Sequence, residues 1–190
     1  GPLGTSSSYR GNSIHSNGPN ASPFFPGLGI DLGPFGPTAN DPGDSDTGSN
    51  NLQNFPIITS VTASGGTTNV KGSLNSSAST SFNLDFYRNS ASDPTGHGEG
   101  EHLIGSTLVT TDALGNANFD TTFSVSTAAS ELLTATATDQ AGNTSEFSPC
   151  ETVGLIGLSI GDVSALEGNS GTTSFSFPVT LQSAATQEIT

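Results

Sequence analysis

Positively charged side chains are scarce in this chain. Its 190 residues include 3 Lys and Arg against 17 Asp and Glu, so the formal net charge is −14 at pH 7. Such a surface repels a phosphate backbone, and no basic stripe is present to bind one. We therefore expect no nucleic-acid partner. An acidic surface with few amines instead suits divalent cations, and hard oxygen ligands favour calcium over zinc or copper.

Cysteine, methionine and long apolar runs are also rare or missing. The single cysteine, Cys150, has no partner for a disulfide within the chain. No apolar run approaches the about 20 residues of a membrane helix, so we expect no membrane span. The start carries neither Met nor a signal peptide, which indicates an internal piece of a longer exported precursor. Low Lys content and stretches rich in Thr, Ser, Asn and Gly are typical of an extracellular or cell-surface bacterial protein.

The sequence offers little support for catalysis or for stacking on sugars. Serines, histidines and acidic residues are present, but no triad of them stands out at recognisable positions. Paired carboxylates that cleave glycosides need a cleft lined with aromatic rings. The chain has no Trp, and its only tyrosines are Tyr9 and Tyr87. We therefore expect a protein that is not an enzyme, and a surface polysaccharide is only a weakly supported partner.

The middle of the chain, from residue 55 to residue 153, predicts an all-β fold. Apolar and polar residues alternate over short stretches such as SFNLDFYRN and ANFDTTFSV, and Gly- and Asp-containing turns separate these stretches. Several short strands within about 100 residues are typical of an immunoglobulin-like β-sandwich. The expected strands cover residues 57–63, 68–74, 81–88, 102–110, 117–125, 132–138 and 144–148.

The same alternation predicts the core. The side chains expected to point inward are Phe82, Leu84, Phe86, Phe119, Phe123, Val125, Leu133, Ala135 and Ala137. We expect Thr134, Thr136 and Thr138 to face solvent or the partner sheet. The pair Gly65–Gly66 can supply the positive φ angles of a tight hairpin. The motif TDxxGN, at 111–116 and again at 138–143, predicts two hairpin corners in which Asp bonds to the turn amides.

Several loops of this segment match a known family in order. The stretches FYRNSASDPTGHGEGEHLIGSTLVTTDALGNANF and TATATDQAGNTSEFS resemble bacterial immunoglobulin-like modules that follow β-helices in secreted surface proteins. Family members often carry a cysteine before DP(S/T)G. This chain has Ser92 there, which leaves Cys150 without the partner that the resemblance implies.

Residues 1–54 are rich in Pro and Gly and form the first expected domain. The motifs GNSIHSNG, GLGIDLG and NDPGDSDTGSNNLQNFP resemble the final coil of a right-handed parallel β-helix, interrupted here by the insertion PNASPFFP. One coil cannot build its own core, because stacked repeats need neighbours. The side chains expected to lean on the next domain or on another chain are Ile14, Leu28, Ile30 and Leu32. Phe24 and Phe25, between two prolines, either plug the end of this coil or of the sandwich, or anchor a neighbouring subunit.

An acidic segment, NDPGDSDTGSNN, closes this first domain. Asp41, Asp44 and Asp46 stand in a turning loop, so their carboxylates can converge on one calcium ion, with Asn50 as a further ligand. Asp139 or Glu99 are the expected distal ligands. The spacing does not fit the EF-hand loop. The alternative interpretation is a plain linker, because Asp, Asn, Gly and Pro are also the common residues of turns.

A second cluster of possible metal ligands lies in DPTGHGEGEH. His97, Glu99, Glu101 and His102 are residue types that bind zinc. The glycines between them favour a solvated loop instead. His15 stands alone and is expected at the surface.

The end of the chain, residues 154–190, forms the third expected domain. In GTTSFSFPVTLQ, the apolar residues Phe175, Phe177, Val179 and Leu181 alternate with polar ones, which predicts a strand over 173–181 with one apolar face. Burying four such side chains is worth roughly 6–12 kcal/mol at about 1.5–3 each, yet an isolated hairpin is marginally stable in water. We expect a second copy of the chain to cover this face.

The segment from Leu158 onward, GLSIGDVSALEGNSGTTSFSFPVTLQSAATQEIT, resembles the opening of a Calx-β domain. In that family calcium is bound by acidic residues of later strands, so the resemblance carries over only Glu167. About 33 residues are present, whereas a complete sandwich has about 100. The resemblance therefore implies an incomplete Calx-β strand pair in this chain.

These patterns predict a non-enzymatic extracellular structural or adhesive protein. Its copies would join by β-strand exchange into an oligomer or a filament, with the strand at 173–181 as donor and calcium as a cofactor. The alternative is a non-catalytic spacer or binding module of a secreted polysaccharide-active enzyme.

Overall fold

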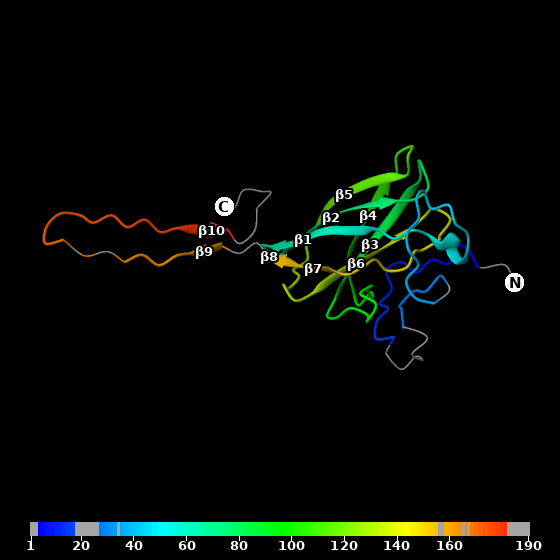
Figure 1. Cartoon of the computed structure of the whole chain (residues 1–190), viewed down its shortest axis with the longest axis horizontal. Helices are drawn as coiled ribbons and strands as arrows, with labels where there is room; N and C mark the ends of the chain where they lie inside the picture. Colours follow the sequence, from blue (N-terminus) through cyan, green and yellow to red (C-terminus); the bar gives the residue numbers. More distant parts are fainter. Residues whose placement is uncertain are drawn as a thin grey trace. The chain divides into compact units, whose positions relative to one another are not determined.

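Two antiparallel sheets of four strands each contain most of the regular secondary structure of this protein (Figure 1). The computed structural model describes residues 4–17, 27–33, 35–155, 158–164, 166 and 168–181. The chain divides after Gly154 into two compact units, residues 1–154 and 155–190, and each is described by itself.

The first sheet has the strand order β5-β2-β1-β8, and the second has the order β4-β3-β6-β7. All neighbouring pairs with a printed register are antiparallel. The prediction of an all-β sandwich is therefore confirmed. The bounds are β1 (Ile57–Ser64), β2 (Thr67–Asn75), β3 (Ser81–Asn89), β4 (His102–Thr110), β5 (Asn116–Phe123), β6 (Leu132–Thr138), β7 (Glu151–Thr152) and β8 (Gly154–Leu155).

The first six expected strands are confirmed, but the seventh, at 144–148, is not a regular strand. This stretch runs antiparallel beside β6, because the N–H groups of Ser145 and Ser148 donate to the carbonyls of Ala137 and Ala135. In the opposite direction the N–H groups of Ala137 and Ala135 donate to the hydroxyls of Ser145 and Ser148. Side-chain oxygens replace carbonyls there, which interrupts the ladder, and β7 pairs with the start of β6 instead.

The turns carry the chemistry that their sequences predict. Gly65 and Gly66, with φ angles of 57° and 83°, connect β1 to β2 in a tight hairpin. In TDQAGN the Asp139 carboxylate accepts the Asn143 N–H, and the turn leads β6 into the stretch beside it. TDALGN forms the same local turn, but the expectation of a hairpin there is wrong. The turn links β4 to β5, which belong to different sheets.

The core between the sheets consists of the side chains that alternation predicts. All of the expected inward residues are either buried in one apolar cluster or packed against it; only Phe123 and Val125 stay partly exposed. The rings of Phe86 and Phe119 meet edge to face at 5.4 Å, which joins the two sheets at their centre.

The outer face of β3 and β6 is also buried, which corrects the expected position of the threonines. Thr134, Thr136 and Thr138 are at most 2% exposed. The loop between β3 and β4 lies against Thr134, since a Cβ atom at Gly98 would stand 1.7 Å from its Cγ2. Sequence alternation cannot show this cover, because it comes from segments far away in the chain.

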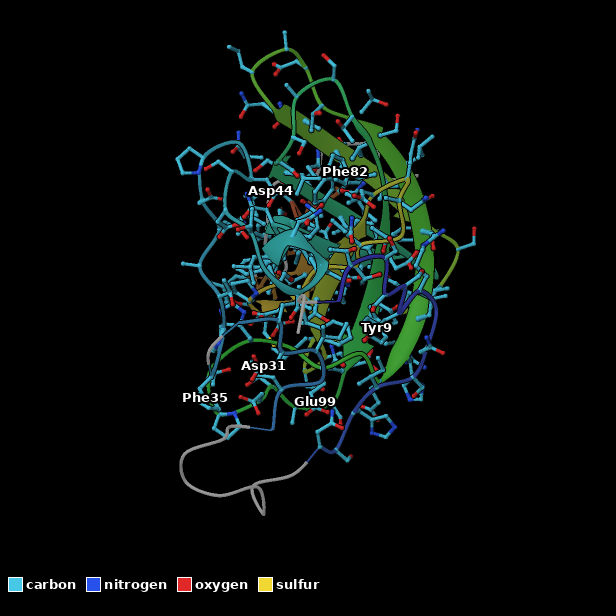
Figure 2. All side chains as sticks on the ribbon, turned by 90° about the vertical axis from the view of Figure 1, so that its right-hand side faces the viewer. Tyr9, Asp31, Phe35, Asp44, Phe82 and Glu99 are labelled. Atoms are coloured by element: carbon cyan, nitrogen blue, oxygen red, sulfur yellow. The ribbon has the colours of Figure 1, made fainter. Side chains whose placement is uncertain are left out.

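The N-terminal segment, residues 4–17, completes the cover of this face (Figure 2). The guanidinium of Arg10 donates to both carboxylate oxygens of Asp85, at 3.0 and 2.8 Å, and Asp85 is 1% exposed. The N–H of Gly11 donates to the Tyr87 hydroxyl, and burial raises the pKa of Tyr87 to about 12. The polar groups on the outer face of β3 are thus covered by the N-terminal segment, which supplies hydrogen-bond donors to them.

A second, smaller core lies under this segment. Ile30 packs with Tyr87 and Phe147, and Ile14 and Leu32 pack against them. The expectation that these isoleucines and Leu32 lean on the following domain is confirmed. The strands expected of a β-helix coil do not occur within the described residues 4–17, 27–33 and 35–54, where Ile14 forms an isolated bridge with Gly100.

We predict that Arg10→Gln lowers the free energy of unfolding by about 3 kcal/mol, because it leaves the buried Asp85 carboxylate without its counter-charge. Lys71→Gln is the matched control, since Lys71 pairs with Asp120 at the surface, and it should change stability little. Urea unfolding of both variants measures the difference. Equal losses would contradict this role for Arg10.

Candidate functional site

The acidic loop at 40–46 is held in place by two neighbouring elements. The side chain of Asn54 accepts the N–H of Asp41 and donates to the Asp41 carbonyl, at 3.1 and 2.7 Å. The Asp44 carboxylate accepts the N–H of Asn54 and the hydroxyl of Ser76, at 3.1 and 2.5 Å. Figure 2 shows Asp44 in this loop. The loop is therefore tied to the end of β2 and to the segment that leads into β1.

Three carboxylates converge in this loop. One oxygen from each of Asp41, Asp44 and Asp46 lies within 4.8 Å of the other two. The Oδ1 atoms of Asp41 and Asp46 are buried and have no hydrogen-bond partner. A carboxylate oxygen removed from water without a donor is costly. The arrangement offers free, preformed oxygen ligands of the kind that a hard divalent cation takes.

The ionisation of the three groups differs for identifiable reasons. The Ser45 hydroxyl and N–H hold the pKa of Asp41 below its usual range. Burial raises the pKa of Asp44, against the effect of its hydrogen bond from Ser76. Burial, and then the charge of Asp41, raise the pKa of Asp46. In two of the three carboxylates, Asp44 and Asp46, burial in the folded state therefore disfavours the charged form.

No basic side chain of the protein relieves this charge. The sequence has three Lys and Arg residues in all. Each forms an ion pair elsewhere: Arg10 with Asp85, Lys71 with Asp120, and Arg88 with Glu131.

Two further expected calcium ligands have other partners. The Asn50 amide accepts from the N–H of Ser7 and donates to the carbonyls of Ser7 and Thr144, so it fastens the N-terminal segment. The Asp139 carboxylate accepts the N–H and the side-chain amide of Asn143. Neither group is free to join the three carboxylates.

The residues with zinc-ligand chemistry at 97–102 do not converge either. His97 packs edge-on against Phe55, with ring centroids 5.2 Å apart, and its Nδ1 lies 3.1 Å from the Phe147 carbonyl. The Glu101 carboxylate accepts the N–H and hydroxyl of Ser90. Glu99 and Glu101 line a polar recess of about 290 Å³, which also includes His15 and Asp93.

Two residues with nucleophilic side chains lie in structural positions. Cys150 is half-buried, and burial raises its thiol pKa to about 11, so the thiol stays protonated at neutral pH. A G-x-S-x-G pattern does occur at 157–161, but its Ser159 lies within a strand and donates to the Thr180 carbonyl. Catalytic serines with this pattern stand at a strand-to-helix turn instead.

The second unit, residues 155–190, contains a long hairpin. Its ends pair as β9 (Leu158–Ile160) and β10 (Val179–Leu181), as Figure 1 shows. The expected strand at 173–181 is therefore formed only over its last three residues. Pro178 explains where the ladder stops, because it has no N–H, and its carbonyl accepts the N–H of Gly161.

Large apolar side chains of this hairpin are exposed. Phe175, Phe177 and Val179 are 49%, 58% and 60% exposed, and Ile160 is 64% exposed. The fourth expected residue of this face, Leu181, ends β10. Phe24, Phe25 and Glu167, also singled out from the sequence, lie outside the described residues.

Several residues that organise these sites carry no signal in the sequence. Glu146 is 3% exposed, and its carboxylate accepts from the N–H of Leu32 and the N–H and hydroxyl of Thr38. Asn54 shapes the acidic loop in a similar way. A lone polar residue gives no indication from sequence that a distant backbone will need its oxygen.

No family model matches the chain, and no curated protein matches it significantly. Among the described residues, no helix is long and apolar enough to cross a membrane.

We predict that Asp46→Asn stabilises the metal-free protein at pH 7. A carboxyl whose pKa is raised by folding favours the folded state when protonated, and this stability is lost as pH rises through the raised pKa. The amide avoids that loss, so the advantage of the variant should shrink as pH falls toward about 4.

Thermal unfolding in a chelator at the two pH values tests this prediction. Asp31→Asn is the control, because Asp31 is exposed and lies outside the group of three carboxylates. An Asp46→Asn variant less stable than the wild type at pH 7 would show that the negative charge of Asp46 does not destabilise the folded state.

Proposed function

We propose that this chain belongs to a non-enzymatic extracellular or cell-surface protein with a structural or adhesive role, whose copies join by adding a strand from the C-terminal hairpin to a neighbouring copy. The observation that carries this proposal is the row of exposed side chains at Phe175, Phe177 and Val179. These side chains alternate with polar ones. Residues 172–178, which include both phenylalanines, lie outside every strand that the described residues form.

Strand addition matches both properties of this stretch. An extended peptide that joins a sheet edge pairs its main chain with that edge, and its alternate side chains fill the surface beside it. Each fully buried side chain of this size is worth about 1.5–3 kcal/mol. Because the donor segment and the receiving edge are different surfaces, the contact is head-to-tail and generates rings or filaments.

The immunoglobulin-like identity of the sandwich is a further part of the proposal. β1, β2 and β5 share one sheet and β3, β6 and β7 the other, as in immunoglobulin domains. β4 lies beside β3 in the second sheet, the place of the additional strand of variable-type domains. The N–H of Cys150 donates to the carbonyl of Gly96, which places Cys150 beside the loop that carries Ser92. This contact supports the resemblance to modules in which a cysteine replaces that serine. The Calx-β and β-helix resemblances at the two ends rest on sequence alone.

We also propose that calcium binds to Asp41, Asp44 and Asp46. The two buried, unpartnered Oδ1 atoms support this site, together with the commitment of all three basic side chains elsewhere. A divalent cation would neutralise the repulsion between the carboxylates of this loop, which Asn54 and Ser76 already hold in place. Its effect would be to stiffen the junction between the N-terminal segment and the sandwich.

The alternative role as a sugar-binding module gains no specific support. The polar recess is lined by small, acidic and amide side chains, with His15 as its one ring apart from Pro94. Sugar sites usually add aromatic faces to such polar groups. A spacer role would leave the apolar row of the hairpin unexplained.

We predict that the double variant Phe175→Ser/Phe177→Ser abolishes self-association in the full chain. The wild type should show a mass that rises with concentration, and more strongly at high salt, because salt screens the repulsion between chains of net charge −14. Light scattering after gel filtration measures the mass.

Leu114→Ser is the control for this experiment. Leu114 is 79% exposed on the turn after β4, so its loss removes a similar apolar surface from elsewhere. Deletion of residues 155–190 should act like the double variant. A wild type that stays monomeric at every concentration, or an oligomer that survives the deletion, would reject the proposal.

Calcium at about 10 mM, roughly ten times the dissociation constant typical of extracellular sites, should stabilise the wild type by about 1.4 kcal/mol. Asp46→Asn should lose most of this gain, whereas Asp31→Asn should keep it. Thermal unfolding with calcium and with chelator gives the values. An equal gain in both variants would place any bound calcium outside the acidic loop.

A further inference from the structure

The outer edge of β4 is the longest sheet edge of the sandwich. Of the four edge strands, β4 has nine residues and β5 has eight, whereas β7 and β8 have two each. An edge strand presents unpaired N–H and C=O groups that can template another strand. Natural proteins usually protect such edges with charges, prolines, bulges or covering loops.

The β4 edge lacks most of these protections. Residues 103–110, LIGSTLVT, contain no charged residue and no proline. The one irregularity is a bulge at Ile104, opposite Phe86 and Tyr87, so the register is regular from Gly105 to Thr110. Leu108, in the middle of this regular part, is 65% exposed.

The β5 edge is protected by charge instead. Asp120 lies in the middle of that strand and pairs with Lys71 on β2. An added strand would have to remove this ion pair from water, which is costly. Within a protein of net charge −14, two copies repel least where neutral segments meet.

The C-terminal hairpin contains such a neutral segment. Residues 168–181, GNSGTTSFSFPVTL, carry no charge. The six residues before Pro178, at 172–177, all have an N–H to donate, and they lie outside any strand. Their number equals the six residues of the regular β4 edge at 105–110. Pro178 would end the added ladder, since it cannot donate.

We infer that β4 is the acceptor edge, and that residues 172–177 of a second copy of the chain add to residues 105–110 as a new edge strand. This inference rests on the proposed function and names its receiving surface. Phe175 or Phe177 then packs beside Leu108, because aromatic and aliphatic side chains on adjacent strands form favourable pairs. The added strand also hides the exposed β4 edge.

Hydrogen exchange of the full chain locates the contact without any variant. Between dilute and concentrated protein, amides in both 103–110 and 172–177 should slow by at least about tenfold, the protection expected of new main-chain hydrogen bonds. Amides of β5 should not change. Protection of the hairpin together with β5, or with neither edge, overturns the assignment of β4 and leaves the proposed function standing.

Two lysine variants provide the matched test. Leu108→Lys places a charge on the exposed face of β4, and Asn118→Lys places the same charge on the exposed face of β5. Both reduce the net repulsion between copies equally, so only the position differs. Leu108→Lys should abolish the concentration-dependent rise in mass while circular dichroism stays unchanged, and Asn118→Lys should keep it.

The remaining outcomes are also decisive. Loss of association in Asn118→Lys alone, in both variants or in neither overturns the assignment of β4. A wild type that stays monomeric and shows no change in exchange overturns the inference together with the proposed function.

Discussion

The shortage of positive charge constrains this structure more than any other property. The chain has three basic side chains and 17 acidic ones. One of the basic side chains, Arg10, forms the most buried ion pair, with Asp85 on the outer face of β3. Other carboxylates are satisfied by neutral donors instead. Glu146 accepts from backbone and a hydroxyl, and Asp112 and Asp139 accept from turn amides. The acidic loop differs, because two of its buried carboxylate oxygens have no hydrogen-bond donor.

The same constraint bears on the association between copies that we propose. Strongly acidic surfaces keep molecules apart, so contact is easiest between uncharged segments. Among the described residues, 103–110 of β4 and 172–177 of the C-terminal hairpin are uncharged; the first segment lies on a sheet edge and the second lies outside any strand. In the association that we propose, uncharged segments would take the place of a complementary charge pattern, and the association would strengthen with salt.

Local patterns predicted the strands and the core well. Alternation in 81–88 and 132–138 located both strands and the inward side chains. It could do so because every second residue of a strand points to the inner face of its sheet, and the inner faces form the sandwich core. The same reasoning failed for Thr134, Thr136 and Thr138, whose outer face is covered by distant segments. It also failed at 144–148, where Ser145 and Ser148 replace carbonyl acceptors, and at 173–178, where alternation exists without a partner strand. For the acidic loop, spacing predicted that Asp41, Asp44 and Asp46 converge. The roles of Asn50 and Asn54 depend on contacts with distant parts of the chain, whereas Asp139 is used by its own local turn.

Electron microscopy of the full chain over a range of concentrations and at high salt shows whether a neighbouring molecule shelters the C-terminal hairpin. We expect strings or rings of sandwich-sized particles that become longer or more numerous with concentration. Separate single particles under all of these conditions would contradict this expectation.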